Sequence, residues 1–229
     1  VYVASSRWGY TNYWHWTLDI VSKILIFTES KLAGNDIKCI IHAGIESNYQ
    51  KQWLDIIMDY ASKRGVDIIT TGKRYVRSKE LIWSNSLALP HPSTTLKKVF
   101  DRLTNQIEFI EKNSDDWSDD ILLMRKKGGI RSILNYDEVV AWANKNGFKV
   151  IVAEDYSVIE QISLFAHCKT LISVHGAGMS NIIFMQKGGR IIELSPDSGF
   201  NPAIQDLCAA CEMDYSLIIC KSNGYKQRI

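Results

Sequence analysis

Apolar positions along this 229-residue chain follow two alternating spacings. Short uninterrupted apolar runs are typical of strands buried in a parallel sheet, whereas apolar residues at every third or fourth position are typical of helices. Helices are predicted over residues 12–28, 49–63, 94–112, 136–146, 157–166, 178–185 and 202–211. Strands are predicted over residues 37–43, 66–70, 121–125, 148–153, 170–174, 190–194 and 214–220. Because the two kinds alternate, we expect βαβ units in a doubly wound α/β fold, with residues 71–93 mostly loop.

Turn and capping residues sharpen several of these boundaries. Gly65 and Gly147 follow the last apolar position of their helices and are typical C-terminal stops. Asn135 is an N-cap, and Ser157 with Glu160 has the spacing of a capping box. These signals support the helical assignments made from periodicity.

A polar stretch at residues 113–120 (NSDDWSDD) interrupts the alternation and is the candidate domain boundary. We therefore expect one α/β domain over residues 1–113 and a Rossmann-like domain over residues 114–229. Two such domains facing each other across a cleft would bind ligands at the carboxyl ends of their strands. The aspartates of this stretch lack the glycine and terminal glutamate of an EF-hand loop, which favours a solvated linker over a metal site.

Composition narrows the possible partners. A net charge of +2, with Lys and Arg scattered along the chain, does not favour nucleic acid. Five cysteines at irregular spacing favour a reducing compartment, and hence a cytoplasmic protein, over a disulfide framework. Cys208 and Cys211 have CxxC spacing, but no second pair matches them, so buried thiols are expected. No apolar run approaches the ~20 residues of a membrane span, and no signal peptide is recognisable.

The segment at residues 170–185 (TLISVHGAGMSNIIFM) is the most informative part of the chain. A buried strand runs directly into His175, Gly176, Ala177 and Gly178, where a helix begins. Backbone N–H groups at such a helix start bind anions, and His175 can donate to a phosphate oxygen. We expect both glycines to permit positive φ and close approach of a ligand. A ligand-free tight turn is the alternative, because the segment lacks the full G-x-G-x-x-G and the Lys-Ser/Thr of a P-loop.

Cations follow the first strand of the same predicted domain. Arg125 ends that strand, with Lys126 and Arg131 just after it. Because the ends of parallel strands meet at one sheet edge, these side chains can converge on an anion near His175. For Lys126 a solvated loop is the alternative. Glu193 ends a later strand and can accept ribose hydroxyls, with a surface carboxylate as its alternative.

Together these segments resemble glycosyltransferase family 61. Residues 12–19 resemble its N-Y-W-H-W-x-x-D signature. Later positions follow the family order: Arg125, Arg131, Asn135, Glu138, Glu160, Gln161, Phe165, Ala166, His175, Gly176, Ala177, Gly178, Asn181, Phe184, Ile192, Glu193, Leu194 and Pro196. Departures are mild: Met179 stands where the family usually has Leu, and Met124 where Ser often precedes the Arg. A sizeable N-terminal part of the family domain is expected to be missing before Val1.

The resemblance implies a GT-B-like architecture, two Rossmann-like domains facing across a cleft with the N-terminal one incomplete. It implies an inverting, metal-independent transferase that needs no cofactor besides its nucleotide-sugar donor, commonly a UDP-sugar. The acceptor would be a carbohydrate or glycan, as in surface or capsular polysaccharide synthesis. Residues 1–113 would then lie on the acceptor side and residues 114–229 would bind the donor. The donor-binding residues would be Arg125, Lys126, Arg131, Gln161, His175, Gly176, Ala177, Gly178, Asn181 and Glu193.

The candidate catalytic base comes from the first domain. His15 and Asp19 are four positions apart, which places them on one helix face within reach of each other. Asp19 would orient the His15 imidazole, which would take the proton of the acceptor hydroxyl. One alternative is that Asp19 is the base and His15 positions the acceptor; another is that the pair only closes the domain interface or caps a neighbouring loop. Trp14 and Trp16 point to different faces of the same helix, so at most one of them is expected to meet the cleft.

Two other functions remain open at this level. A sugar-nucleotide epimerase or hydrolase would bind the same donor without an acceptor. A truncated, non-catalytic homologue would act as a partner or scaffold.

Overall fold

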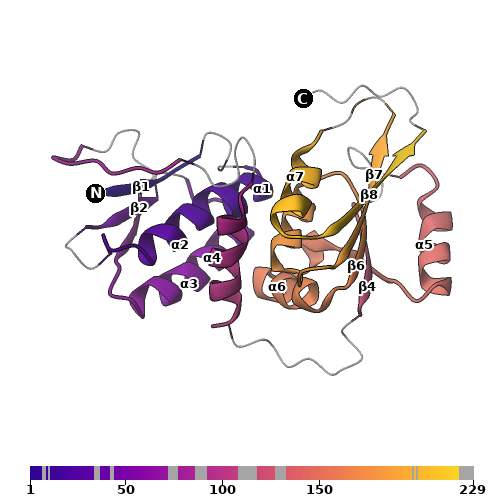
Figure 1. Ribbon diagram of the computed structural model, residues 1–229, viewed down its shortest axis with the longest axis horizontal. Helices are drawn as coiled ribbons and strands as arrows, with labels where there is room; N and C mark the ends of the chain where they lie inside the picture. Colours follow the sequence, from indigo (N-terminus) through magenta and orange to yellow (C-terminus); the bar gives the residue numbers. More distant parts are fainter. Residues whose placement is uncertain are drawn as a thin grey trace. The chain divides into compact units, whose positions relative to one another are not determined.

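The computed structural model describes residues 1–6, 9, 11–33, 37–41, 44–71, 77–85, 92–107, 118–126, 133–197, 199 and 201–221. The chain divides into two compact units, Val1–Glu108 and Phe109–Ile229 (Figure 1). The predicted boundary between residues 113 and 114 lies outside the described residues. The predicted mixture of helices and parallel strands is confirmed in both units.

The first unit contains a three-stranded parallel sheet in the order β1-β2-β3. Its strands are β1 (Tyr2–Ala4), β2 (Cys39–Ile41) and β3 (Ile68–Thr70). The second and third were predicted, but β1 was not. This strand is only three residues long, and its partner strand β2 lies 37 positions further along the chain (Tyr2 pairs with Cys39), so no local periodicity reveals it.

Helices of the first unit supply its core. They are α1 (Tyr13–His15), the π-helical segment η1 (Trp16–Val21), α2 (Ser22–Thr28), α3 (Asn48–Ser62) and α4 (Thr94–Thr104). The first three form the continuous helical stretch predicted over residues 12–28, and α2 packs against both α3 and α4. All six residues of η1 are buried. The π-helical turn had no sequence signal, and such turns occur frequently at functional sites.

The helix predicted over residues 94–112 is shorter than expected. It ends at Thr104, where the Asn105 N–H still bonds to the Asp101 carbonyl and the Gln106 N–H turns back to Leu103. Leu103 is the last buried apolar residue of α4. Asn105 and Gln106 just beyond the helix are exposed, and residues 108–112 of the predicted helix lie outside the described residues.

The second unit is a five-stranded, wholly parallel sheet in the order β5-β4-β6-β7-β8. The strands are β4 (Asp120–Met124), β5 (Lys149–Val152), β6 (Thr170–Val174), β7 (Arg190–Pro196) and β8 (Asp214–Cys220). They are connected by α5 (Tyr136–Lys145), η3 (Ala153–Asp155) with α6 (Val158–His167), η4 (Ala177–Phe184) and α7 (Ala203–Ala210). The predicted doubly wound fold is thus confirmed here. Its direction of winding reverses between β4 and β6, the switch point where such sheets bind ligands.

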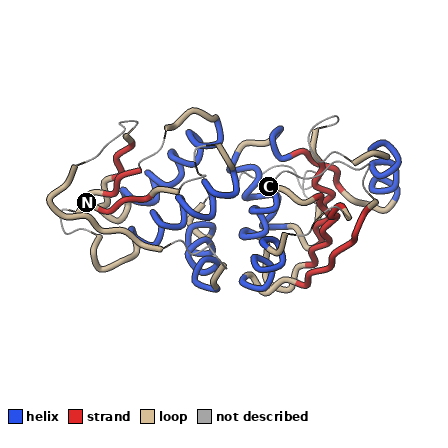
Figure 2. Tube along the Cα trace, turned by 90° about the horizontal axis from the view of Figure 1, so that it is seen from above, coloured by secondary structure: helices blue, strands red, loops and turns tan. Residues whose placement is uncertain are grey.

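Successive side chains of each strand point to opposite faces of the sheet, which explains why helices cover both faces. Leu122, Met124 and Ile172 pack with Ala143 of α5 in one hydrophobic cluster. Residues one position along each strand therefore face the other side, which is covered by α6 and α7 (Figures 1 and 2). The predicted capping box of α6 is present, and Gly147 has the left-handed φ of 81° expected of a C-terminal stop. Asn135 occupies the N-cap of α5, but its side chain bonds to Glu138 and not to the helix backbone.

Candidate functional site

The loop between β6 and η4 lies at the switch point of the second sheet. Gly176 precedes η4 with φ 171° and ψ 172°, which is extended backbone. The prediction of positive φ for Gly176 and Gly178 is therefore wrong; the left-handed glycines in the described part of the chain are Gly65, Gly147 and Gly188. What Gly176 provides is space, since a Cβ there would lie 2.8 Å from Arg125 Nη1.

Arg125 follows the last residue of β4, and Gly176 follows β6 closely. These two strands are neighbours in the sheet, so their carboxyl ends carry Arg125 and the glycine loop to one place. The Arg125 guanidinium lies directly against Gly176, while a Cβ at Gly178 would lie 3.3 Å from Leu123 Cδ2. Both glycines thus allow close packing: the first admits a cation beside the helix start, and the second lets η4 approach β4. A guanidinium beside the backbone N–H groups at a helix start is suited to binding an anion.

His175 is held by a buried carboxylate. Its Nδ1 lies 2.5 Å from Glu193 Oε1, and the Tyr215 hydroxyl donates to Glu193 Oε2 at 2.7 Å. Glu193 is 0% exposed, whereas His175 is 13% exposed. Burial, followed by the hydrogen bond to Glu193, raises the pKa of the Tyr215 hydroxyl, which keeps it a neutral donor.

These contacts correct two predictions about Glu193. The residue does not end its strand, because β7 continues to Pro196. Nor is it the surface carboxylate considered as an alternative. Both of its oxygens already accept hydrogen bonds within the protein, so a contact with ribose would require one of them to be exchanged. Tyr215 was missed by sequence reasoning; only the strand order puts it on the same face of the neighbouring strand as Glu193.

Lys126 pairs with Asp155 at 3.3 Å, and both side chains are more than half exposed. This favours the solvated-loop alternative for Lys126, because exposed ion pairs hold a side chain only weakly. Arg131 lies outside the described residues. Ala177 is the first residue of η4, where it can contribute its backbone N–H.

Gln161 and Asn181 form a buried amide pair. Gln161 Nε2 donates to the carbonyls of Ala153 and Tyr156 at 2.9 and 3.1 Å, and Asn181 Nδ2 donates to Gln161 Oε1 at 2.8 Å. Both side chains are buried. The pair joins α6, η3 and η4, so any contribution to donor binding would be made by fixing the position of η4.

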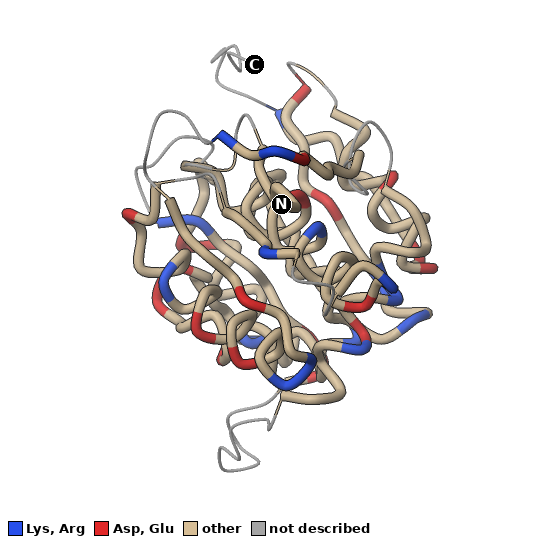
Figure 3. The backbone as a smooth tube through the Cα atoms, turned by 90° about the vertical axis from the view of Figure 1, so that its left-hand side faces the viewer, with Lys and Arg blue, Asp and Glu red and all other residues tan. Residues whose placement is uncertain are grey.

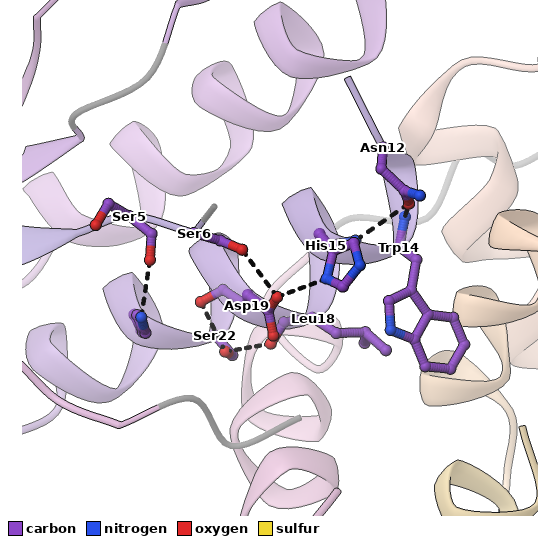
Figure 4. Close-up of polar contacts among 9 residues, drawn as sticks. Ser5, Ser6, Asn12, Trp14, His15, Leu18, Asp19 and Ser22 are labelled. Atoms are coloured by element: carbon purple, nitrogen blue, oxygen red, sulfur yellow. Dashed lines mark hydrogen bonds and ion pairs between the residues drawn. The ribbon is translucent and has the colours of Figure 1, made fainter. Parts of the chain in front are cut away.

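The first unit holds the second candidate pair (Figure 4). His15 Nδ1 lies 2.8 Å from Asp19 Oδ2, which confirms that the two side chains share one helix face. Ser6 Oγ donates to the same oxygen at 3.0 Å, a contact that sequence reasoning missed because Ser6 belongs to a separate loop. The Asn12 side chain accepts from the Trp14 N–H at 2.9 Å and so begins the helix that carries the pair.

Burial distinguishes the members of this pair. Asp19 is 1% exposed and His15 is 19% exposed, so His15 is the group that a substrate can reach. Lys23, one turn along the helix from Asp19, donates to the Ser5 carbonyl at 2.8 Å. Burial lowers the pKa of Lys23, and the Asp19 carboxylate opposes this shift. Trp14 and Trp16 are both buried, at 9% and 0% exposure.

Positions of basic and acidic residues are interspersed along the backbone (Figure 3). Among the described residues, no three His, Cys, Asp or Glu side chains group closely enough to hold a metal ion. In the same part of the chain, every helix is too short or too polar to cross a membrane.

A doubly wound parallel sheet with an arginine and a glycine loop at its switch point is characteristic of α/β proteins that bind phosphorylated ligands. The chain belongs to the glycosyltransferase 61 family, whose pattern it matches over residues 13–192. That range includes the His15–Asp19 pair as well as Arg125 and His175.

Two plant proteins illustrate the similarity. The chain is 32% identical over 84 residues, 35% of its length, to an alpha-1,3-arabinosyltransferase of Oryza sativa subsp. japonica. It is 33% identical over 76 residues, 33% of its length, to a beta-1,2-xylosyltransferase of the same organism. The matched stretches cover 14% and 13% of these relatives, so the chain corresponds to only a small part of their length.

Proposed function

We propose that this chain carries the donor site and the catalytic base of a glycosyltransferase that moves a sugar from a nucleotide sugar to a carbohydrate acceptor. The main support for this proposal is that the Arg125 guanidinium lies against Gly176 at the switch point of the second sheet. Membership of glycosyltransferase family 61 supports the reaction class. The proposal includes a GT-B-like arrangement, with the two units facing each other across the donor.

The donor is proposed to be a UDP-sugar whose diphosphate lies at the start of η4. Arg125 and the backbone N–H groups there supply positive charge and donors, and His175 supplies a third contact. Because the two rice relatives are named for arabinose and xylose transfer, UDP-pentoses are the first donors to test. The acceptor is proposed to belong to a surface polysaccharide or another glycan.

The proposed transfer inverts the anomeric centre. The acceptor oxygen attacks the anomeric carbon from the face opposite UDP, the bond from that carbon to the diphosphate oxygen breaks, and its electrons leave with UDP. His15 takes the acceptor proton at Nε2, because its Nδ1 is bonded to Asp19. The low exposure of Asp19 favours His15 over Asp19 as the base. The departing diphosphate gains negative charge, which Arg125 and the start of η4 stabilise without a metal ion.

The test is to incubate the protein with UDP-xylose and UDP-arabinose, with and without a panel of oligosaccharides, and to follow donor and free UDP. UDP release that depends on an acceptor is expected. Donor turnover without an acceptor would indicate the hydrolase or epimerase alternative. Binding of UDP without any turnover, or no binding at all, would contradict catalysis by this chain and leave the non-catalytic alternative.

A further inference from the structure

We propose that Tyr215 and Glu193 act as positioning residues that fix the His175 imidazole for the donor diphosphate. The inference rests on the proposed function and goes beyond it by assigning roles to two groups that do not touch the donor. It adds Tyr215, which lies on β8, 22 residues from Glu193 along the chain. The three side chains form one chain of hydrogen bonds from a half-buried phenol to a partly exposed imidazole.

The first step is the tautomer of His175. A carboxylate only accepts hydrogen bonds, so Nδ1 must carry a hydrogen to bond with Glu193 Oε1 at 2.5 Å. In the proposed site the contact with a phosphate oxygen would be made by Nε2, which must then also carry a hydrogen. Without the carboxylate, the neutral imidazole would exchange between two tautomers and rotate about its side-chain bonds.

The second step is the orientation of the carboxylate itself. Glu193 is fully buried, and its second oxygen accepts from the Tyr215 hydroxyl at 2.7 Å. Both oxygens are therefore engaged, one by the group that is positioned and one by a fixed donor. Because burial and Glu193 raise the pKa of Tyr215, this hydroxyl remains a donor over the pH range in which the protein is assayed.

The third step is the location of the chain of bonds. His175 directly precedes Gly176, against which the Arg125 guanidinium lies. A positioned imidazole therefore adds to the Arg125 guanidinium at one proposed anion site. Contacts that are already in place need not be ordered when the ligand binds, which improves affinity.

A double-mutant cycle tests whether Tyr215 acts through His175. UDP affinity is measured by calorimetry for the wild type, Tyr215→Phe, His175→Ala and the double variant. We expect roughly 3–10-fold weaker binding for Tyr215→Phe and roughly 10–150-fold for His175→Ala, from the usual sizes of neutral and charge-assisted hydrogen bonds. In the double variant, Tyr215→Phe should add nothing.

Tyr60→Phe is the matched control. It removes a hydrogen bond of the same kind, from the Tyr60 hydroxyl to Glu29 at 2.6 Å, in the other unit. UDP affinity should not change. Equal losses for both tyrosine variants would indicate general destabilisation and overturn the inference.

Imidazole ¹⁵N spectra give a second readout that needs no donor. His175 should carry a hydrogen on Nδ1 in the free wild type, and its Nδ1 signal should shift in Tyr215→Phe but not in Tyr60→Phe. A neutral His175 with its hydrogen on Nε2 would overturn the positioning role. So would a Tyr215→Phe loss of affinity that persists in the His175→Ala background. Unchanged UDP affinity in His175→Ala would instead contradict the donor-site assignment, and with it the purpose of the positioning residues.

Discussion

The substitution Gly176→Ala tests whether the position of the Arg125 guanidinium determines diphosphate binding. The added Cβ would lie 2.8 Å from Arg125 Nη1, whereas non-bonded heavy atoms prefer about 3.5–4 Å. The guanidinium must therefore move by about 1 Å. A hydrogen bond near 2.9 Å that lengthens by this amount is no longer a hydrogen bond. Alanine should thus remove most of the Arg125 contribution to diphosphate binding.

The fold should tolerate this substitution. A φ of 171° is extended backbone that alanine adopts readily, and the group that must move is the end of a flexible side chain. We expect a change in unfolding free energy within about 0.5 kcal/mol. Gly199→Ala is the matched control, because a Cβ at Gly199 would have no neighbour within 4 Å.

Calorimetry with UDP provides the measurement. Loss of one charge-assisted contact, about 1.5–3 kcal/mol, corresponds to roughly 10–150-fold weaker binding in Arg125→Ala. Gly176→Ala should approach that loss, and the double variant should bind no more weakly than Arg125→Ala. Wild-type affinity in Gly176→Ala would refute the reasoning. An equal further loss in the Arg125→Ala background would also refute it, because the effect would then belong to the loop and not to the guanidinium.

Four further outcomes are expected. His15→Ala should lower kcat by ~10²–10⁴-fold with UDP affinity intact; near-full turnover here and in Asp19→Asn would remove both residues from the mechanism. Transfer should survive excess EDTA, and a loss restored by Mn²⁺ or Mg²⁺ would contradict metal independence. Gln161→Leu removes three hydrogen bonds, two of them buried, and should cost ~2–4 kcal/mol of stability in urea titrations; an unchanged unfolding midpoint would contradict this. Burial raises the pKa of Tyr2 from 10.0 to about 12, so stability present below pH 10 should fall as pH rises toward 12, and less steeply in Tyr2→Phe.

Sequence reasoning succeeded where spacing along one element decides the geometry. The His15–Asp19 contact follows from a four-residue interval on one helix, and the strands of the second sheet follow from their apolar runs. The meeting of Arg125 with Gly176 was also predictable, because both residues follow parallel strands and such strands end at one sheet edge. In each case the geometry of one helix, or the general rule that parallel strands end at one edge, is enough to predict which residues lie close together.

It failed where side chains from distant segments meet. Tyr215 reaches Glu193 only because β7 and β8 are neighbours, and Ser6 reaches Asp19 from a separate loop. Neither contact leaves a mark in local sequence. The positive φ predicted for Gly176 was wrong for a related reason. A glycine can be required for an unusual backbone conformation or because a side chain would have no room. Only the position of the Arg125 guanidinium shows that the second reason applies to Gly176.

Both candidate sites hold a histidine in the same way. In each unit Nδ1 of a partly exposed imidazole meets a buried carboxylate, which also accepts from a hydroxyl: Ser6 on Asp19, and Tyr215 on Glu193. The shared geometry fixes the orientation of the imidazole in both cases, but the proposed tasks differ. A base needs a lone pair on Nε2, whereas a phosphate contact needs a hydrogen there.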